Sequence, residues 1–268
     1  MPINTQSVTN VQATHPLQSA AGVQNVQSTN KAVEVGQSWK GSLSWQSGAT
    51  PLEDNSHFRE NLTNQAALLQ PTAHSCMNCK EAVLLMGLKA YADTPESNRV
   101  IRELEDSVSD DIGYNEILDE VVGYDESEPA TSFEAGDVVF FFADTHVALG
   151  AEDGKVLSLW FGPSSSGNLQ EASPEDLFQL TKENPEVYYQ AAKGWFNVES
   201  GDPEIEFQFL DVKSQLQDAL EANGGLSPTQ KYEFTAKIDG LLRQAGADPN
   251  NAWEFITVAK QPLEVLAK

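Results

Sequence analysis

The stretch GDVVFFFADTHVALGAEDGKVLSLWFG, residues 136–162, decides the fold of this chain. It holds three short runs rich in β-branched and aromatic residues, at 138–142, 146–149 and 156–160, and such runs are typical of β-strands. Asp144-Thr145 and Asp153-Gly154 interrupt the runs and are typical turn residues. Turns this short join antiparallel neighbours. The stretch therefore predicts an antiparallel meander.

A helix is predicted upstream of the meander, within NCKEAVLLMGL at 78–88. Asn78 is a favourable N-cap, and Glu81, three residues later, completes a capping-box pattern. Cys79 would then be the first helical residue. Helical patterning also occurs at 58–69 and at 97–122. Together these patterns predict an α+β domain in which a helix that opens with Cys79 packs on the antiparallel sheet.

Three parts of the chain differ in composition. Residues 1–40 are rich in Gln, Asn, Ser and Thr with almost no charge, which predicts a disordered leader that could act as a secretion signal. Residues 41–200 would form the α+β domain. Residues 201–268 would form a small helical C-terminal module. Its expected helices are 210–222, a helix that starts at Ser227-Pro228, and a third segment from Trp253 to Val258.

The charge of the chain limits its partners. The formal net charge is −24, and the first forty residues contribute +1, so the rest of the chain carries −25. A body this acidic repels nucleic-acid backbones and anionic lipid surfaces, and protein, peptide or glycan substrates fit better. No apolar stretch approaches the roughly 20 residues that cross a bilayer. No basic end followed by an apolar core, as in a secretory signal, begins the chain.

Cys76 and Cys79 are the only cysteines, and three readings of them compete. A redox pair of the thioredoxin kind needs a buried strand just upstream, which the sequence lacks. A zinc site could use His74 with both cysteines, but tetrahedral zinc needs a fourth ligand from a second cluster. We therefore expect neither a metal nor a cofactor. The third reading is a nucleophile at the start of a helix.

Cys79 suits the role of nucleophile better than Cys76. The positive end of the helix dipole would lie at its sulfur, which favours the thiolate and predicts a lowered thiol pKa. A cysteine nucleophile also needs a base. His146 is the best candidate, because it begins a β-run directly after a turn. A structural histidine at a strand end is the alternative reading of His146.

At this point the sequence resembles the papain-like cysteine hydrolases of the NlpC/P60 kind. In that family a cysteine opens a helix that packs on an antiparallel sheet, and a strand that begins with the catalytic histidine follows. The corresponding segments here are NCKEAVLLM, GDVVFFF, HVALG and DGKVLSLW, within residues 76–165. The resemblance implies a papain-like fold with Cys79 as nucleophile and His146 as base. It also implies a third polar residue on the next strand, and Ser158 is the best placed.

The sequence departs from the family pattern at two points. The third residue is often His, Asp, Asn or Gln in the family, and a serine cannot stabilise an imidazolium as a carboxylate can. A tight two-residue hairpin at Asp153-Gly154 would point Ser158 away from His146, whereas one additional residue would turn it back. The alternatives from the flanking loops are Asp144, Glu152, Asp153, Asn168 and Gln170. Ala73 occupies the position of the family's oxyanion glutamine, and Gln70 is out of place, so no oxyanion hole is identified.

These observations predict a cysteine-dependent amide hydrolase: a protease, a protein glutamine deamidase or a transamidase. The leader resembles those of injected bacterial effectors. This implies export without a Sec signal peptide, a host protein as substrate, and a secretion chaperone as a further partner. One alternative is a peptidoglycan peptidase that acts as an antibacterial toxin with a cognate inhibitor. Another is a non-enzymatic acidic binding protein on a hydrolase fold.

Overall fold

The computed structural model describes residues 30–45, 58–59, 62, 64–72, 75–107, 109–159 and 168–268. Its helices are α1 (Lys31–Ser38), α3 (Gln65–Leu68), α4 (Cys79–Ala90), α5 (Pro95–Asp106), α6 (Asp111–Val122), α7 (Pro174–Glu183), α8 (Pro185–Glu199), α9 (Pro203–Asn223) and α10 (Pro228–Gln244). The short 3₁₀ helices are η1 (Tyr124–Glu126), η2 (Glu152–Gly154), η3 (Ala252–Phe255) and η4 (Pro262–Ala267). The strands are β1 (Ser44–Trp45), β2 (Cys76–Met77), β3 (Glu128–Pro129), β4 (Val138–Phe141), β5 (His146–Gly150), β6 (Val156–Leu159), β7 (Leu169–Ala172) and β8 (Ile256–Ala259).

The main sheet is antiparallel and has six strands in the order β3-β8-β4-β5-β6-β7. Strands β4, β5 and β6 form the meander that the sequence predicts. β8 comes from the other end of the chain and inserts between β3 and β4. The α+β class and the antiparallel sheet are therefore confirmed.

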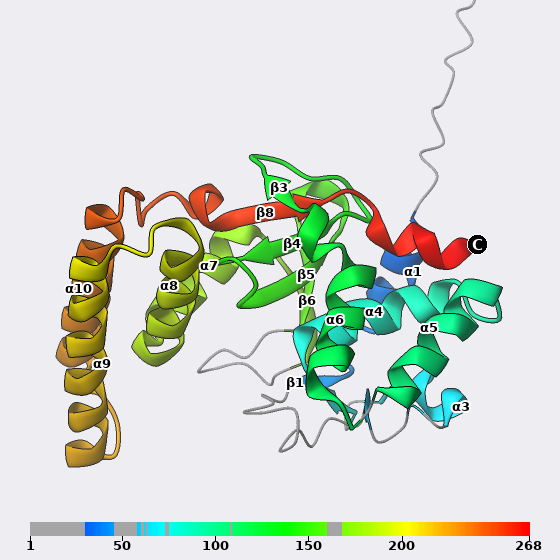
Figure 1. Cartoon of the computed structure of the whole chain (residues 1–268), viewed down its shortest axis with the longest axis horizontal. Helices are drawn as coiled ribbons and strands as arrows, with labels where there is room; N and C mark the ends of the chain where they lie inside the picture. Colours follow the sequence, from blue (N-terminus) through cyan, green and yellow to red (C-terminus); the bar gives the residue numbers. More distant parts are fainter. Residues whose placement is uncertain are drawn as a thin grey trace, which may run out of the picture.

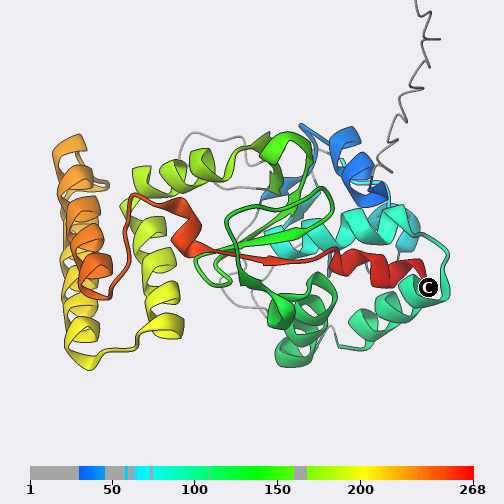
Figure 2. The ribbon, with the colours of Figure 1, turned by 90° about the horizontal axis from the view of Figure 1, so that it is seen from above.

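Helices cover both faces of the sheet (Figures 1 and 2). Alternate residues of β4, β5 and β6 enter two separate cores, as the pleat requires. Val147 and Leu157 belong to the core shared with α1, α4, α5 and α6. Ala148 and Val156 belong to the core shared with α7, α8, α9 and α10. Figure 1 shows α9 and α10 as the layer farthest from the sheet on that second side.

Two predictions about the ends of the chain are wrong. Within the predicted leader, residues 31–38 form helix α1, capped by Asn30 and packed through buried Ala32 and Val33; residues 1–29 lie outside the described part. The third C-terminal helical segment is instead η3 followed by strand β8. The β-branched run Ile256-Thr257-Val258 explains the strand, because it pairs with both β3 and β4.

The remaining helical predictions agree with the structure where it describes them. Residues 97–122 fall in α5 and α6, and the Ser227 start signal forms a capping box on α10. In 58–69, residues 65–68 form α3. The division of the chain at residue 200 stays a prediction. Within the described residues, no helix is both long and apolar enough to span a bilayer.

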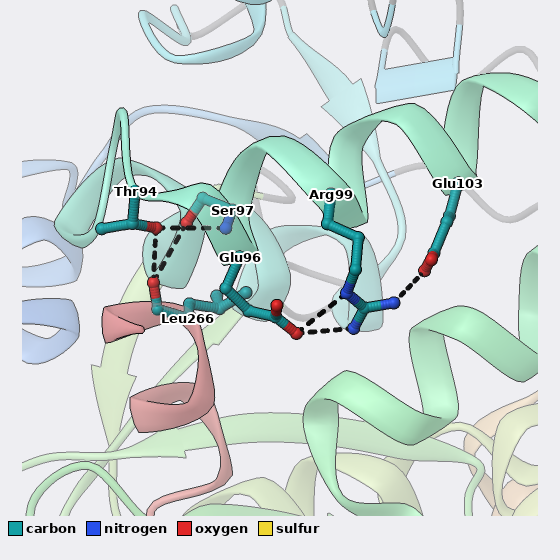
Figure 3. Close-up of polar contacts among 6 residues, drawn as sticks. All are labelled: Thr94, Glu96, Ser97, Arg99, Glu103 and Leu266. Carbon is teal, nitrogen blue, oxygen red and sulfur yellow. Dashed lines mark hydrogen bonds and ion pairs between the residues drawn. The ribbon is translucent and has the colours of Figure 1, made fainter.

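The end of the chain is fastened to helix α5 (Figure 3). The Thr94 hydroxyl donates to the carbonyl oxygen of Leu266 at 2.7 Å, and the Ser97 hydroxyl reaches the same oxygen at 3.4 Å. Arg99 bridges Glu96 and Glu103 along the outer face of α5. The last residues therefore pack beside the helices on the α4 side of the sheet, away from α9 and α10.

Candidate functional site

The start of α4 is fixed by the capping box that the sequence predicts. The Asn78 side chain accepts from the main-chain N–H of Glu81 at 2.9 Å, and the Glu81 carboxylate accepts from the N–H of Asn78 at 2.9 Å. The other carboxylate oxygen of Glu81 accepts from the Tyr114 hydroxyl at 2.9 Å. Glu81 is fully buried. Cys79 is thus held as the first residue of the helix.

The thiol of Cys79 lies against strand β5. The main-chain N–H groups of Val147 and Lys80 lie near its sulfur and favour the thiolate, and Val147 directly follows His146. Burial raises the pKa of the Cys79 thiol to about 11, and the charge of Asp144 raises it further. The predicted lowering of this pKa is therefore wrong. The helix start offers hydrogen bonds to the thiolate, but the loss of solvation costs the thiolate more.

His146 is the first residue of β5, and its side chain is almost fully buried. Its Nε2 atom lies 2.8 Å from Oγ of Ser158, and the two groups share a hydrogen bond. The ring packs beside Phe141, its partner across the β4–β5 pair. Burial lowers the pKa of His146 to about 3. The imidazole is therefore neutral at neutral pH.

The loop between β5 and β6 determines the orientation of Ser158. The loop is η2, a three-residue connection closed by a 2.7 Å hydrogen bond from Ala151 to Lys155. It pairs Leu149 with Leu157, one residue away from the register of a tight hairpin. This register places Ser158 on the face of the sheet that carries His146. Of the two hairpin geometries considered, the longer one occurs.

Four of the five alternatives for the third residue lie elsewhere or make other contacts, and Gln170 is the exception. Asp144 pairs with Lys80, and the Asn168 amide donates to the carbonyl of Gly41. Glu152 and Asp153 belong to η2. Gln170 is the cross-strand partner of Ser158, so it shares the face of Ser158 and His146.

The three predicted catalytic residues lie on two different sides of the main sheet. His146 and Ser158 lie on the side of α7 and α8, like Phe141. Cys79 comes from the α4 side, where it packs against the other core. Its sulfur meets the strand at the main chain of Val147. The structure thus joins His146 to Ser158 through their side chains, and Cys79 to the peptide unit next to His146.

Lys80 is a functional candidate that the sequence analysis missed. Its ammonium lies 2.5 Å from a carboxylate oxygen of Asp119 on α6, and 2.5 Å from one of Asp144 in the β4–β5 turn. Burial raises the pKa of Asp144 to about 6, although Lys80 opposes this. The partners of Lys80 lie 39 and 64 residues away in the sequence. No local pattern could have identified them.

Tyr124 lines two cavities that lie close to this ion pair. One, of about 370 Å³, is lined by Ala143 of the β4–β5 turn, by Trp195 of α8 and by Glu199 and Glu254. The other, of about 490 Å³, is lined mainly by carboxylates of α6 and η1. In the described part of the chain, no basic side chain lines either cavity.

Cys76 and Cys79 are not joined in a disulfide, and Cys76 begins strand β2. His74 and Ala73 lie outside the described residues. Among the residues that are described, no group of three or more His, Cys, Asp or Glu is placed to hold a metal ion. Comparisons with protein-family models, with curated proteins and with solved structures find no match to this chain. The resemblance to NlpC/P60 hydrolases therefore rests on the sequence motifs alone and stays a prediction.

Proposed function

We propose that this protein is a papain-like, cysteine-dependent amide hydrolase with Cys79 as nucleophile, His146 as base and Ser158 as the residue that orients the base. One observation carries the proposal. The Nε2 atom of His146 is hydrogen-bonded to Oγ of Ser158 at 2.8 Å, and the main-chain N–H of the next residue, Val147, lies near the sulfur of Cys79.

The raised thiol pKa and the lowered imidazole pKa favour a neutral pair at rest. His146 would remove the thiol proton as the sulfur attacks the carbonyl carbon of an amide. A sulfur–carbon bond forms and the carbon–nitrogen bond breaks, and the proton passes from His146 to the leaving nitrogen. Water then attacks the thioester, His146 takes a proton from this water, and the acid product leaves with the Cys79 thiol restored.

The substrate that we propose is a protein, cleaved in its backbone or deamidated at a glutamine. The Ser/Thr/Asn/Gln-rich start of the chain supports delivery into a host cell by an injection machine. The net charge of −24 favours a substrate with basic segments. The two cavities beside Tyr124 would present only carboxylates as charged groups to such a segment.

A non-enzymatic binding protein is the second candidate, and two observations favour it. The thiol pKa of Cys79 is raised, where an activated nucleophile usually has a lowered one. Helix α9 also exposes large apolar side chains: Phe207 is 72% and Leu210 is 49% exposed. On this reading His146 and Ser158 form a buried structural pair, and α9 binds a partner.

The rate of iodoacetamide alkylation at Cys79 as a function of pH separates the two candidates. The rate is read by peptide mass spectrometry in the wild type and in His146→Ala, with Cys76 as the internal reference. If His146 assists the neutral thiol, the wild-type rate is flat across neutral pH. In His146→Ala it falls about tenfold per pH unit below the thiol pKa, because only the thiolate reacts. Equal rates in both proteins at every pH would contradict the hydrolase.

A further inference from the structure

The side chain of Lys80 connects the two parts of the chain that carry the proposed nucleophile and base. Lys80 directly follows Cys79 on α4, and its partner Asp144 lies two residues before His146. Asp119 binds the same ammonium from α6 and makes a third anchor. The Lys80 side chain is only 15% exposed. Three elements that are far apart in the sequence thus meet at the ammonium of one largely buried side chain.

We propose that Lys80 is a positioning residue that holds the β4–β5 turn, and His146 with it, against the start of helix α4. This inference rests on the proposed function, since it assumes that Cys79 and His146 act together. Lys80 itself takes no part in the bond-making steps. Its role is to fix the place of the base relative to the sulfur.

The turn needs support because its backbone is strained. Phe142 and Ala143 are consecutive non-glycine residues with φ of 52° and 57°, a region that L-residues rarely adopt. On the α8 side, the turn is held by a 2.7 Å hydrogen bond from the Phe142 N–H to the carbonyl of Phe255. It also lies close to Gly194, where an added Cβ would come within 3.0 Å of the Thr145 hydroxyl. On the α4 side, the ion pair with Lys80 holds it.

The charges around Asp144 make its carboxylate dependent on Lys80. The charges of Lys80 and Asp119 shift the pKa of Asp144, and the charge of Asp144 shifts the pKa values of Cys79 and Tyr124. Lys80 is the sole cation of this set. The Oδ1 atom of Asp144 is buried and accepts no hydrogen bond from the described residues. Without Lys80, a partly buried carboxylate would be left unpaired beside Asp119, and the turn would have to move or the carboxyl to take up a proton.

A double-mutant cycle between Lys80 and His146 tests the proposal. The rate of iodoacetamide alkylation of Cys79 at pH 7 is measured in the wild type, Lys80→Met, His146→Ala and the double variant. Lys80→Met keeps the aliphatic stem and removes the charge. Lys80→Arg is the conservative variant expected to restore the pairing. Lys182→Met is the matched control, because Lys182 is equally buried (12% exposed) and pairs with Asp239, far from Cys79.

We expect His146→Ala to lower the rate about a hundredfold in the wild type, in the Lys182→Met background and in the Lys80→Arg background. In the Lys80→Met background the same change should have an effect of about twofold or less, because the base is already displaced. An undiminished effect of His146→Ala in Lys80→Met would overturn the positioning role and leave the hydrolase in place. No effect of His146→Ala in the wild type would overturn both. If Lys80→Met does not fold, Asp144→Ala removes the same pair from the other side and replaces it in the cycle.

Discussion

Asp144 and Lys80 act in opposite directions on the sulfur of Cys79, and this predicts the effect of removing one charge. The carboxylate of Asp144 raises the thiol pKa and the ammonium of Lys80 lowers it. Asp144→Asn should therefore lower the thiol pKa from about 11, because the neutral amide repels a thiolate less. The pH dependence of thiolate absorbance in the ultraviolet measures it, with Cys76→Ser as the background.

Asp119→Asn is the matched control for this change. Asp119 binds the same ammonium as Asp144, but it is not among the groups that shift the thiol pKa. Its removal should leave the pKa of Cys79 closer to the wild-type value. A thiol pKa that stays constant or rises in Asp144→Asn would show that Asp144 does not act on the sulfur through its charge.

Ser158 holds the imidazole of His146 through a hydrogen bond with its Nε2 atom. Ser158→Ala removes the hydrogen bond to Nε2 inside a fully buried site, which should lower the free energy of unfolding by about 1–3 kcal/mol. It should also lower the rate of alkylation of Cys79 across neutral pH, where the wild-type rate does not change with pH, because the imidazole loses its fixed orientation. Thiol kinetics and urea denaturation measure the two effects.

Thr181→Val is the control for stability alone. Thr181 is a buried residue whose hydroxyl donates to the carbonyl of Leu177 at 2.8 Å, far along the chain from Cys79. It should reduce stability without changing the alkylation of Cys79. If Ser158→Ala behaves like Thr181→Val, Ser158 has a structural role only.

At the scale of elements, the β5–β6 loop determines whether the serine faces the histidine. Deleting Asp153 would shorten η2 to two residues and shift the register by one. Every side chain of β6 would then change face, so Leu157 and Leu159 would leave their core while Ser158 would leave His146. We expect a large fall in the urea midpoint and loss of the His146 effect on alkylation.

Gly154→Ala is the companion variant, because it keeps the loop length. Gly154 has φ of +69° and no atom within 4 Å of an added Cβ, so the change costs backbone strain alone, about 1 kcal/mol. The register and the His146–Ser158 bond should persist. A deletion variant as stable as Gly154→Ala would show that the loop length does not set the register.

Local sequence patterns were sufficient for some of these elements and not for others. The meander and the capped start of α4 follow from residues adjacent in the chain, and both were predicted. The orientation of Ser158 depends on one residue of loop length, which the pattern Asp153-Gly154 leaves open. The strand β8 is short and reaches the sheet only after two long helices, so its pairing could not be inferred. The sign of the Cys79 pKa shift depends on burial, which a sequence does not give.

At the scale of the whole molecule, the buried His146 and the partly buried Asp144 give opposite contributions to the pH dependence of stability. The pKa of His146 is lowered from 6.5 to about 3, so the stability it contributes is present above pH 6.5 and is lost as pH falls toward 3. The pKa of Asp144 is raised from 3.8 to about 6, so its contribution is present below pH 3.8 and is lost as pH rises through 6. Between pH 3.8 and 6, His146 makes the free energy of unfolding rise with pH, and Asp144 makes it fall with pH.

Replacing His146 or Asp144 by a residue with a neutral amide should isolate the contribution of that residue to the pH dependence of the free energy of unfolding. The free energy of unfolding of the wild type at low pH does not isolate these two groups by itself. Lowering the pH toward the isoelectric point of about 4.3 also relieves the repulsion among 40 acidic residues. The difference in free energy of unfolding between a variant and the wild type removes that shared term. For His146→Gln, this difference should shift in favour of the variant as pH falls from 6.5 toward 3. For Asp144→Asn, it should shift in favour of the variant as pH rises from 3.8 to 6. Urea denaturation at half-unit steps of pH measures both. If both differences changed in the same direction with pH, the pKa shift of one of the two residues would have the opposite sign to the one given above.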